Sequence, residues 1–193
     1  MSQLADAQLT VKEAAFVTGL GERIVNHEID ARVIPSRAMQ GERRIRGADV
    51  LYLGAVRNVR EGLGQPLRRR LRNAIAKAAA EKAREATVEH FHVVLGELEG
   101  ELLGAFQELQ AMRRDHIESR ADVLAGEPVI KGTRIAARHI ADLIKRGASE
   151  AEVREDFDLT DDQIRAAVVF DQVTPKRGRP AVRRQRTVHV PAA

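Results

Sequence analysis

The chain has 193 residues and a formal net charge of +4, contains no cysteine, and has 3% aromatic residues. This length allows one domain or two small ones. The absence of cysteine excludes a disulfide framework and thiolate metal sites, and the shortage of aromatics argues against base-stacking platforms. The N-terminus is polar and no apolar run approaches the roughly 20 residues of a membrane helix, so we expect a cytoplasmic protein without membrane contact.

Charge is distributed unevenly along the chain. Residues 1–84 carry 16 Lys/Arg and 9 Asp/Glu, residues 85–170 carry 10 Lys/Arg and 18 Asp/Glu, and residues 171–193 carry 6 Lys/Arg and 1 Asp/Glu. A basic head, an acidic middle and a basic tail indicate that the two ends bind a polyanion. The alternative is uneven ion pairing on an ordinary solvated surface.

Residues 1–65 show the outline of a helix-turn-helix. Thr10 is placed to cap a helix over 11–18, a turn follows at 19–21, and the next helix covers 22–29. Val33 and Ile34 predict a strand, residues 39–46 a hairpin, and Asp49 the cap of a helix over 50–59. This order resembles the winged-helix heads of the MerR and excisionase families over residues 8–60.

That resemblance implies that the second helix enters the major groove of duplex DNA. The residues expected to face the bases are Arg23, Asn26 and His27, whose types suit base reading. Those expected to contact phosphates from the wing are Arg37, Arg43, Arg44 and Arg46. In the competing interpretation, Arg23 and Arg32 only pair with the acids nearby, Glu22, Glu28 and Asp30.

Residues 66–115 predict a helix from Pro66 to about residue 86, then a strand. Four arginines lie in the first turns of this helix, where the helix dipole favours acidic residues. They are expected either to bind an anion outside the protein or to form a solvated face. These residues are Arg68, Arg69, Arg70 and Arg72. The side chains of residues 88–95 alternate in character as in a single strand. His90 and His92 would lie on one side of this strand, and we expect them to be surface or interface residues rather than metal ligands. Residues 98–109 fit a second strand and a helix, or one helix throughout. A strand pair alone is marginal, so this segment is expected to mediate dimerisation or partner binding.

Residues 116–173 predict three short helices. Thr133 is placed to cap a helix ended by Gly147, Ser149 and Glu152 form a capping box for the second, and Thr160 caps a third over 161–170. The segment contains a Gly-x-Pro-x-Ile-x-Gly-Thr-Arg-Ile core, formed by Gly126, Pro128, Ile130, Gly132, Thr133, Arg134 and Ile135. A final helix carries Leu159, Thr160, Ile164 and Ala167.

These two motifs resemble the bacterial family of unknown function numbered 433. Phe157 and Asp158 stand where the family usually has Tyr-Pro. The resemblance implies an antitoxin of a type II toxin–antitoxin pair, VapB-like, whose partner is a PIN-like ribonuclease toxin. It specifies the domain, and function follows only by analogy.

Residues 174–193 combine Pro175, Pro180 and a glycine with six basic residues and have no apolar periodicity, so this tail is expected to build no core of its own. Three interpretations stand. The tail wraps the toxin and inserts arginine among its metal-binding carboxylates, it lies in the A·T minor groove as an AT-hook does, or it is a solubilising end. The candidate toxin-binding residues are Arg177, Arg179, Arg183 and Arg184.

The sequence therefore predicts a mainly α protein with small β elements, an N-terminal winged helix-turn-helix and a C-terminal three-helix domain. No catalytic constellation, metal site or cofactor site emerges, which disfavours an enzyme. The leading hypothesis is an antitoxin that neutralises a PIN-like ribonuclease and represses its own operon by binding operator DNA, as a homodimer or a higher toxin–antitoxin assembly. The alternatives are a transcriptional regulator without a toxin and a scaffold whose basic ends meet RNA.

Overall fold

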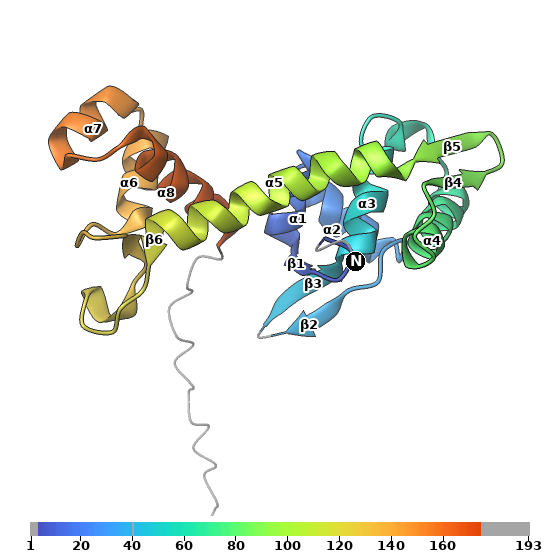
Figure 1. Ribbon diagram of the computed structural model, residues 1–193, viewed down its shortest axis with the longest axis horizontal. Helices are drawn as coiled ribbons and strands as arrows, with labels where there is room; N and C mark the ends of the chain where they lie inside the picture. The colour runs from blue at the N-terminus through green and yellow to red at the C-terminus, as the bar shows by residue number, and fades with distance from the viewer. Residues whose placement is uncertain (1–3, 40, 175–193) are drawn as a thin grey trace, which may run out of the picture.

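The computed structural model describes residues 4–39 and 41–174, which form two blocks joined by a long helix (Figure 1). The N-terminal block is residues 4–94, the connecting helix is α5 (Leu95–His116), and the C-terminal block is residues 117–174. Helices dominate and the sheets are small and antiparallel, which confirms the predicted fold class at this level.

A three-stranded sheet and three helices build the first part of the N-terminal block. The sheet has the order β1 (Gln8–Thr10), β3 (Glu42–Arg46), β2 (Arg37–Met39), with Leu9 opposite Ile45 and Ala38 opposite Arg43. The helices are α1 (Val11–Thr18), α2 (Glu22–Asp30) and α3 (Gly47–Val56). Thr10 caps α1 in a capping box with Glu13, as predicted, and Gly19 ends α1 with a φ of 69°.

A fourth helix and a hairpin complete this block. After the short 3-10 turn η1 (Arg60–Gly62), α4 (Gln65–Ala80) packs against α3, and the hairpin of β4 (Glu85–Val88) and β5 (Phe91–Val94) leads into α5. The buried side of α4 carries Leu71, Ile75 and Ala78 at helical spacing.

Helix α5 is continuous over 22 residues, about 33 Å at 1.5 Å per residue. Leu95, Leu102 and Leu109 are buried at a spacing of seven, so one side of the helix faces the core. Leu102 lies so close to α3 that a Cβ added to Gly54 would stand 2.8 Å from its side chain. Arg113 near the end of α5 pairs with the buried Glu13 of α1.

The C-terminal block begins with the two-stranded pair β6 (Ile117–Glu118) and β7 (Val129–Ile130), with the 3-10 turn η2 (Leu124–Gly126) between them. Three helices follow: α6 (Ala137–Lys145), α7 (Glu150–Phe157) and α8 (Asp161–Val173). The predicted capping box of Ser149 with Glu152 and the cap of Thr160 are confirmed. Its core comprises Ile130, Ala137, Ile140, Val153, Leu159, Ile164 and Ala167.

Helix α8 connects the two cores. Its first half contributes Ile164 and Ala167 to the C-terminal core, whereas Val169 and Val173 pack into the N-terminal core. Lys12 of α1 donates a hydrogen bond from Nζ to the carbonyl oxygen of Thr174, at 3.2 Å. The C-terminal block is therefore packed against the N-terminal block and is not suspended on α5 alone.

Two predictions for the N-terminal block are wrong. Val33 and Ile34 form no strand, because both of their N–H groups donate to the carbonyl of Glu28, at 2.9 and 3.2 Å, and so close the end of α2. Asp49 does not cap α3. The helix begins at Gly47, three residues before the predicted start at residue 50, and a Cβ at Gly47 would collide with the carbonyl oxygen of Leu4.

Two predictions further along the chain also fail. The single strand over 88–95 is a hairpin, because Glu89 takes a φ of 52° and turns the chain between Val88 and Phe91. Thr133 does not cap α6 either. Its hydroxyl donates to Ile130 and accepts from the N–H of Ile135, which closes the turn before the helix. Of the alternatives for 98–109, one continuous helix is correct.

Across the described ranges 4–39 and 41–174, no helix is both long and apolar enough to cross a bilayer.

Replacing Leu102 by Ala removes a fully buried side chain where α5 meets α3. We expect the free energy of unfolding to fall by about 2–5 kcal/mol, measured by urea denaturation. Val59→Ala, at a side chain that is 47% exposed, is the control and should change it by less than about 0.5 kcal/mol. Equal effects of the two substitutions would contradict this packing.

Candidate nucleic-acid interface

The exposed side of α2 carries the three residues predicted to read bases. Arg23 and His27 are exposed, one helical turn apart, and Asn26 is half-buried between them. Asn26 donates from its amide to the carbonyl of Glu22 (3.1 Å) and accepts from Nη1 of Arg43 (3.3 Å). The structure thus brings one wing arginine, on β3, against the predicted reading helix.

Arg43 is also held by a carboxylate. Its Nη1 lies 2.8 Å from Oδ1 of Asp30, and both side chains are largely exposed. An exposed pair of this kind contributes at most about 1 kcal/mol, so a phosphate competes with it easily. Arg23 and Arg32 form no ion pair with Glu22, Glu28 or Asp30 among the described residues. Asp30 pairs instead with Arg43, and Glu28 pairs with Arg60 and Arg68.

The other wing arginines lie on the opposite face of the sheet. Arg37 and Arg44 are directly opposed on β2 and β3, and alternation along β3 gives Arg46 the same face as Arg44. Arg44 is half-buried and donates to the carbonyl of Gln8 (3.4 Å), whereas Arg46 lies 3.4 Å from Asp49. The seven predicted DNA-contacting residues therefore divide between two surfaces, with Arg23, Asn26, His27 and Arg43 on the α2 side.

A buried carboxylate fixes the position of α2. Glu28 is 0% exposed and accepts from the hydroxyl of Tyr52 on α3 (3.0 Å), from Nε of Arg60 on η1 (2.6 Å), and from Nη1 of Arg68 on α4. Burial and the neighbouring Glu28 raise the pKa of the Tyr52 hydroxyl, so Tyr52 remains a proton donor. The sequence patterns did not predict this cluster, although an acid at position 28, on the same side of α2 as Val25 and Ile29, was a signal for it.

A second buried carboxylate ties α3 to α4. Asp49 accepts from Nε of Arg72 at 2.6 Å and pairs with Arg46. Arg68 and Arg72 thus neutralise internal carboxylates, and Arg70 lies 2.6 Å from Glu89. The prediction that these arginines bind an outside anion or form a solvated face is wrong for Arg68 and Arg72. Arg69 donates to the carbonyl of Ala31, at 3.0 Å.

The motif residues of the C-terminal block mostly build turns. Gly126 and Gly132 have φ values of 80° and 79°, which favour glycine. The carbonyl of Pro128 accepts from the N–H of Ala137, and Thr133 makes the turn described above. Arg134 is exposed, which makes it the motif residue whose side chain is free to contact a partner.

Helices α6 and α8 are joined by a buried aspartate. Asp171 is 4% exposed and pairs with Arg138 (3.1 Å) and Lys145. Burial acts to raise the pKa of Asp171, but the hydrogen bonds from Lys145 and Arg138 outweigh it and hold that pKa below its usual value.

An acidic surface covers α7 and the start of α8. Its members are exposed carboxylates, and one of them, Asp161, pairs with Arg154 at 2.9 Å. The surface comprises Glu150, Glu152, Glu155, Asp156, Asp158, Asp161 and Asp162. In Figure 1 it lies at the end of the molecule far from α2 and the β2–β3 hairpin.

Several predicted sites lie elsewhere. The tail residues Arg177, Arg179, Arg183 and Arg184 are outside the described residues. His90 stands in the β4–β5 turn, and His92 lies 3.3 Å from the hydroxyl of Thr87, so the two histidines do not share a strand face. Within residues 4–39 and 41–174, no group of three or more His, Asp or Glu is arranged to hold a metal ion.

Residues 117–170 match the family described as "Protein of unknown function (DUF433)". This match confirms the resemblance that the C-terminal motifs indicated. The chain is also 27% identical over 184 residues to "Uncharacterized protein y4eO" of Sinorhizobium fredii (strain NBRC 101917 / NGR234), covering 89% of this chain and 83% of that protein. The similarity therefore extends over both blocks. No solved structure matches the chain.

Glu28→Gln leaves Arg60 and Arg68 without their carboxylate, and we expect a loss of about 3–5 kcal/mol in the free energy of unfolding. Glu89→Gln, which breaks the exposed pair with Arg70, is the matched control and should cost less than about 1 kcal/mol. Urea denaturation measures both. A Glu28→Gln protein as stable as the control would refute the role assigned to this carboxylate.

Asp171→Asn tests the link between α6 and α8. Because the pKa of Asp171 is lower in the folded state, its carboxylate stabilises the fold above the unfolded pKa of about 3.9, and this contribution is lost as pH falls through the folded pKa. The variant should be less stable at pH 6 and should show a shallower loss of stability below pH 4, measured by urea midpoints. Asp162→Asn, which leaves Asp171 intact, should keep the wild-type pH dependence, and an Asp171→Asn curve parallel to wild type would exclude the assignment.

Proposed function

We propose that the protein is an antitoxin that binds operator DNA through α2 and the β2–β3 hairpin and neutralises a PIN-like ribonuclease through its C-terminal block and tail. The observation that carries the DNA-binding part is the surface formed by Arg23, Asn26, His27 and Arg43. The toxin-binding part rests on the family resemblance and on the acidic surface.

The geometry of α1, α2 and the hairpin suits a winged helix-turn-helix. A turn over 19–21 joins the two helices, and the hairpin returns beside α2, where Arg43 reaches Asn26. Arginine and asparagine make bidentate contacts with guanine and adenine, so Arg23 and Asn26 are suited to base reading. Arg43, the hairpin arginine on the α2 side, would contact a phosphate and help to set the register on the duplex.

The acidic surface on α7 and α8 supports a separate partner site. Helix α7 lies at the other end of the molecule from α2 and the β2–β3 hairpin (Figure 1), so one molecule would have room for both partners. A ribonuclease that binds RNA has a basic surface, and complementary charge accelerates association. The exposed Arg134 and the tail arginines Arg177, Arg179, Arg183 and Arg184 would add contacts to carboxylates of the nuclease.

The proposed assembly is a dimer. The β4–β5 hairpin packs against α4, and among the described residues each of its strands keeps one edge that pairs with no other strand. Pairing across a second copy would place two α2 helices on one operator, as two-fold symmetric sites require.

One observation favours the alternative of a regulator without a toxin. Val169 and Val173 of α8 complete the N-terminal core, so the C-terminal block also has a structural role in the head. In this alternative the acidic surface has no nuclease partner.

Substitutions on α2 and the hairpin test DNA binding. Arg43→Ala should weaken binding to all duplex sequences and reduce the slope of log affinity against log salt by about 0.9. Arg44→Ala, on the opposite face of the sheet, should reduce that slope less than Arg43→Ala does. Asn26→Ala should instead change the preference at one base pair, by about 1–3 kcal/mol. Asp30→Asn should raise affinity severalfold, because it removes the carboxylate that neutralises Arg43.

Fluorescence anisotropy with labelled duplexes measures these effects, and Arg114→Ala on the exposed side of α5 is the charge-matched control. If Arg114→Ala and Arg43→Ala have the same effect, the loss reflects net charge and not this surface.

Co-expression with the protein encoded in the neighbouring reading frame tests toxin binding, and the proposal requires that protein to be a ribonuclease. Full-length protein should copurify with it and inhibit RNA cleavage, and replacing Glu155 and Asp156 by Lys should slow association. Unchanged inhibition after deletion of residues 174–193 would exclude the tail, and no complex with the full chain would favour the regulator.

A further inference from the structure

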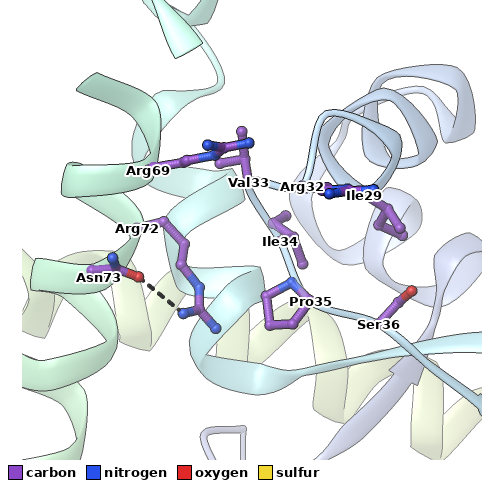
Figure 2. A pocket seen from close by; sticks show the side chains of 9 residues that line it. All are labelled: Ile29, Arg32, Val33, Ile34, Pro35, Ser36, Arg69, Arg72 and Asn73. Atoms are coloured by element: carbon purple, nitrogen blue, oxygen red, sulfur yellow. Dashed lines mark hydrogen bonds between the residues drawn. The ribbon is translucent and has the colours of Figure 1, made fainter. Parts of the chain in front are cut away.

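A pocket of about 420 Å³ lies between α4 and the segment that follows α2 (Figure 2). Its floor is apolar and includes Ile29, Ile34 and Pro35. Its polar side chains come from both elements, with Arg32 and Ser36 on one and Arg69 on the other. This volume is within the range of small-molecule sites.

The pocket lining is basic and contains no carboxylate. The charge of Arg72 is neutralised by Asp49, whose Oδ1 lies 2.6 Å from Nε of Arg72. Arg72 therefore contributes hydrogen-bond donors but little net charge to the pocket. Arg69 donates to a neutral carbonyl, and Arg32 makes no ion pair or side-chain hydrogen bond within residues 4–39 and 41–174. Two positive charges in this pocket therefore lack a counter-charge in the described structure.

The backbone of Arg32 supports a functional role for its side chain. Arg32 occupies the position after the end of α2 with a φ of 56°, where glycine is less strained. The same geometry occurs at Lys82, but the pocket lined by Lys82 also contains the acids Asp6 and Glu99. At Arg32 the strained backbone places an unpaired guanidinium at a pocket without acids.

We propose that this pocket binds a phosphate ester. The guanidinium groups of Arg32 and Arg69 pair with the phosphate oxygens, a geometry that favours arginine. The hydroxyl of Ser36 supplies a neutral donor. The side-chain oxygen of Asn73 accepts from Arg72 at 3.1 Å, which leaves the Asn73 amide free to donate. The apolar floor contacts the sugar that carries the phosphate.

Two sources offer this chemistry: the backbone of a DNA strand and a free nucleotide. Arg23, Asn26 and Arg43 do not line the pocket, so the proposed phosphate site is distinct from the residues proposed to read bases and goes beyond the proposed function. Binding of a free nucleotide would add a small-molecule signal to the protein.

The test uses the ¹⁵N-labelled full-length protein titrated with thymidine monophosphate, and a duplex of arbitrary sequence in a separate anisotropy titration. The variant is Arg32→Gly with Arg69→Gln. Arg70→Gln, one position away on α4 and outside the pocket, is the matched control. Arg32→Gly relieves the left-handed backbone, so the thermal midpoint of that single variant should equal or exceed that of wild type.

If the source is a free nucleotide, the amide signals of Ser36 and Asn73 shift saturably and the double variant loses tenfold or more in affinity. If the source is the DNA backbone, the double variant weakens duplex binding and reduces the salt slope by about 0.9 for each arginine removed. The Arg70→Gln protein behaves as wild type in both titrations. The proposal is overturned if thymidine monophosphate causes no saturable shift at these residues and the double variant binds duplex as tightly as the control.

Discussion

The position of α2 depends on one buried carboxylate with three donors. Glu28 carries a negative charge in the protein interior, which is unfavourable unless partners neutralise it and satisfy its oxygens. Tyr52, Arg60 and Arg68 do so from three different elements, so α2 is held against α3, η1 and α4 at once. Because Glu28 lies on the buried side of α2, this cluster also orients the opposite, exposed side with Arg23 and His27. The helix that carries the proposed DNA surface is therefore fixed by buried contacts before any ligand binds, which lowers the entropic cost of binding.

The same use of buried charge recurs at each junction of the molecule. Asp49 joins α3 to α4, Glu13 joins α1 to α5, and Asp171 joins α6 to α8. With so few aromatics, the core consists mainly of aliphatic side chains, which pack without directional preference. Buried ion pairs have a defined geometry, and we infer that they select one arrangement of the helices here. The arginines that give the head its positive charge are therefore partly structural, and the net charge of a segment overstates the charge it offers to a polyanion.

The local signals in the sequence predicted much of the fold. The caps at Thr10, Ser149 and Thr160 and the hairpin near residues 39–46 are short-range features, and each formed where its residues indicated. The failures have tertiary causes. Val33 and Ile34 have the composition of a strand but cap α2, and Gly47 begins α3 because the chain at Leu4 comes close. The alternating pattern over residues 88–95 predicted one strand. Such a pattern does not reveal a turn made by a non-glycine residue with positive φ, as Glu89 makes here. For the site, residue types and helical spacing placed Arg23, Asn26 and His27 together, but only the folded chain shows that Arg43 joins them while Arg37, Arg44 and Arg46 lie on the other face.

We propose that the exposed side of α2, with Arg43 beside it, is the surface that meets duplex DNA. The most direct measurement is an amide chemical-shift map of the full-length protein with and without a short duplex in dilute salt. The largest shifts should fall on Arg23, Asn26, His27 and the β2–β3 hairpin, with α7 unchanged. Shifts confined to α7 and α8, or no shifts at any residue in 50 mM salt, would contradict the account.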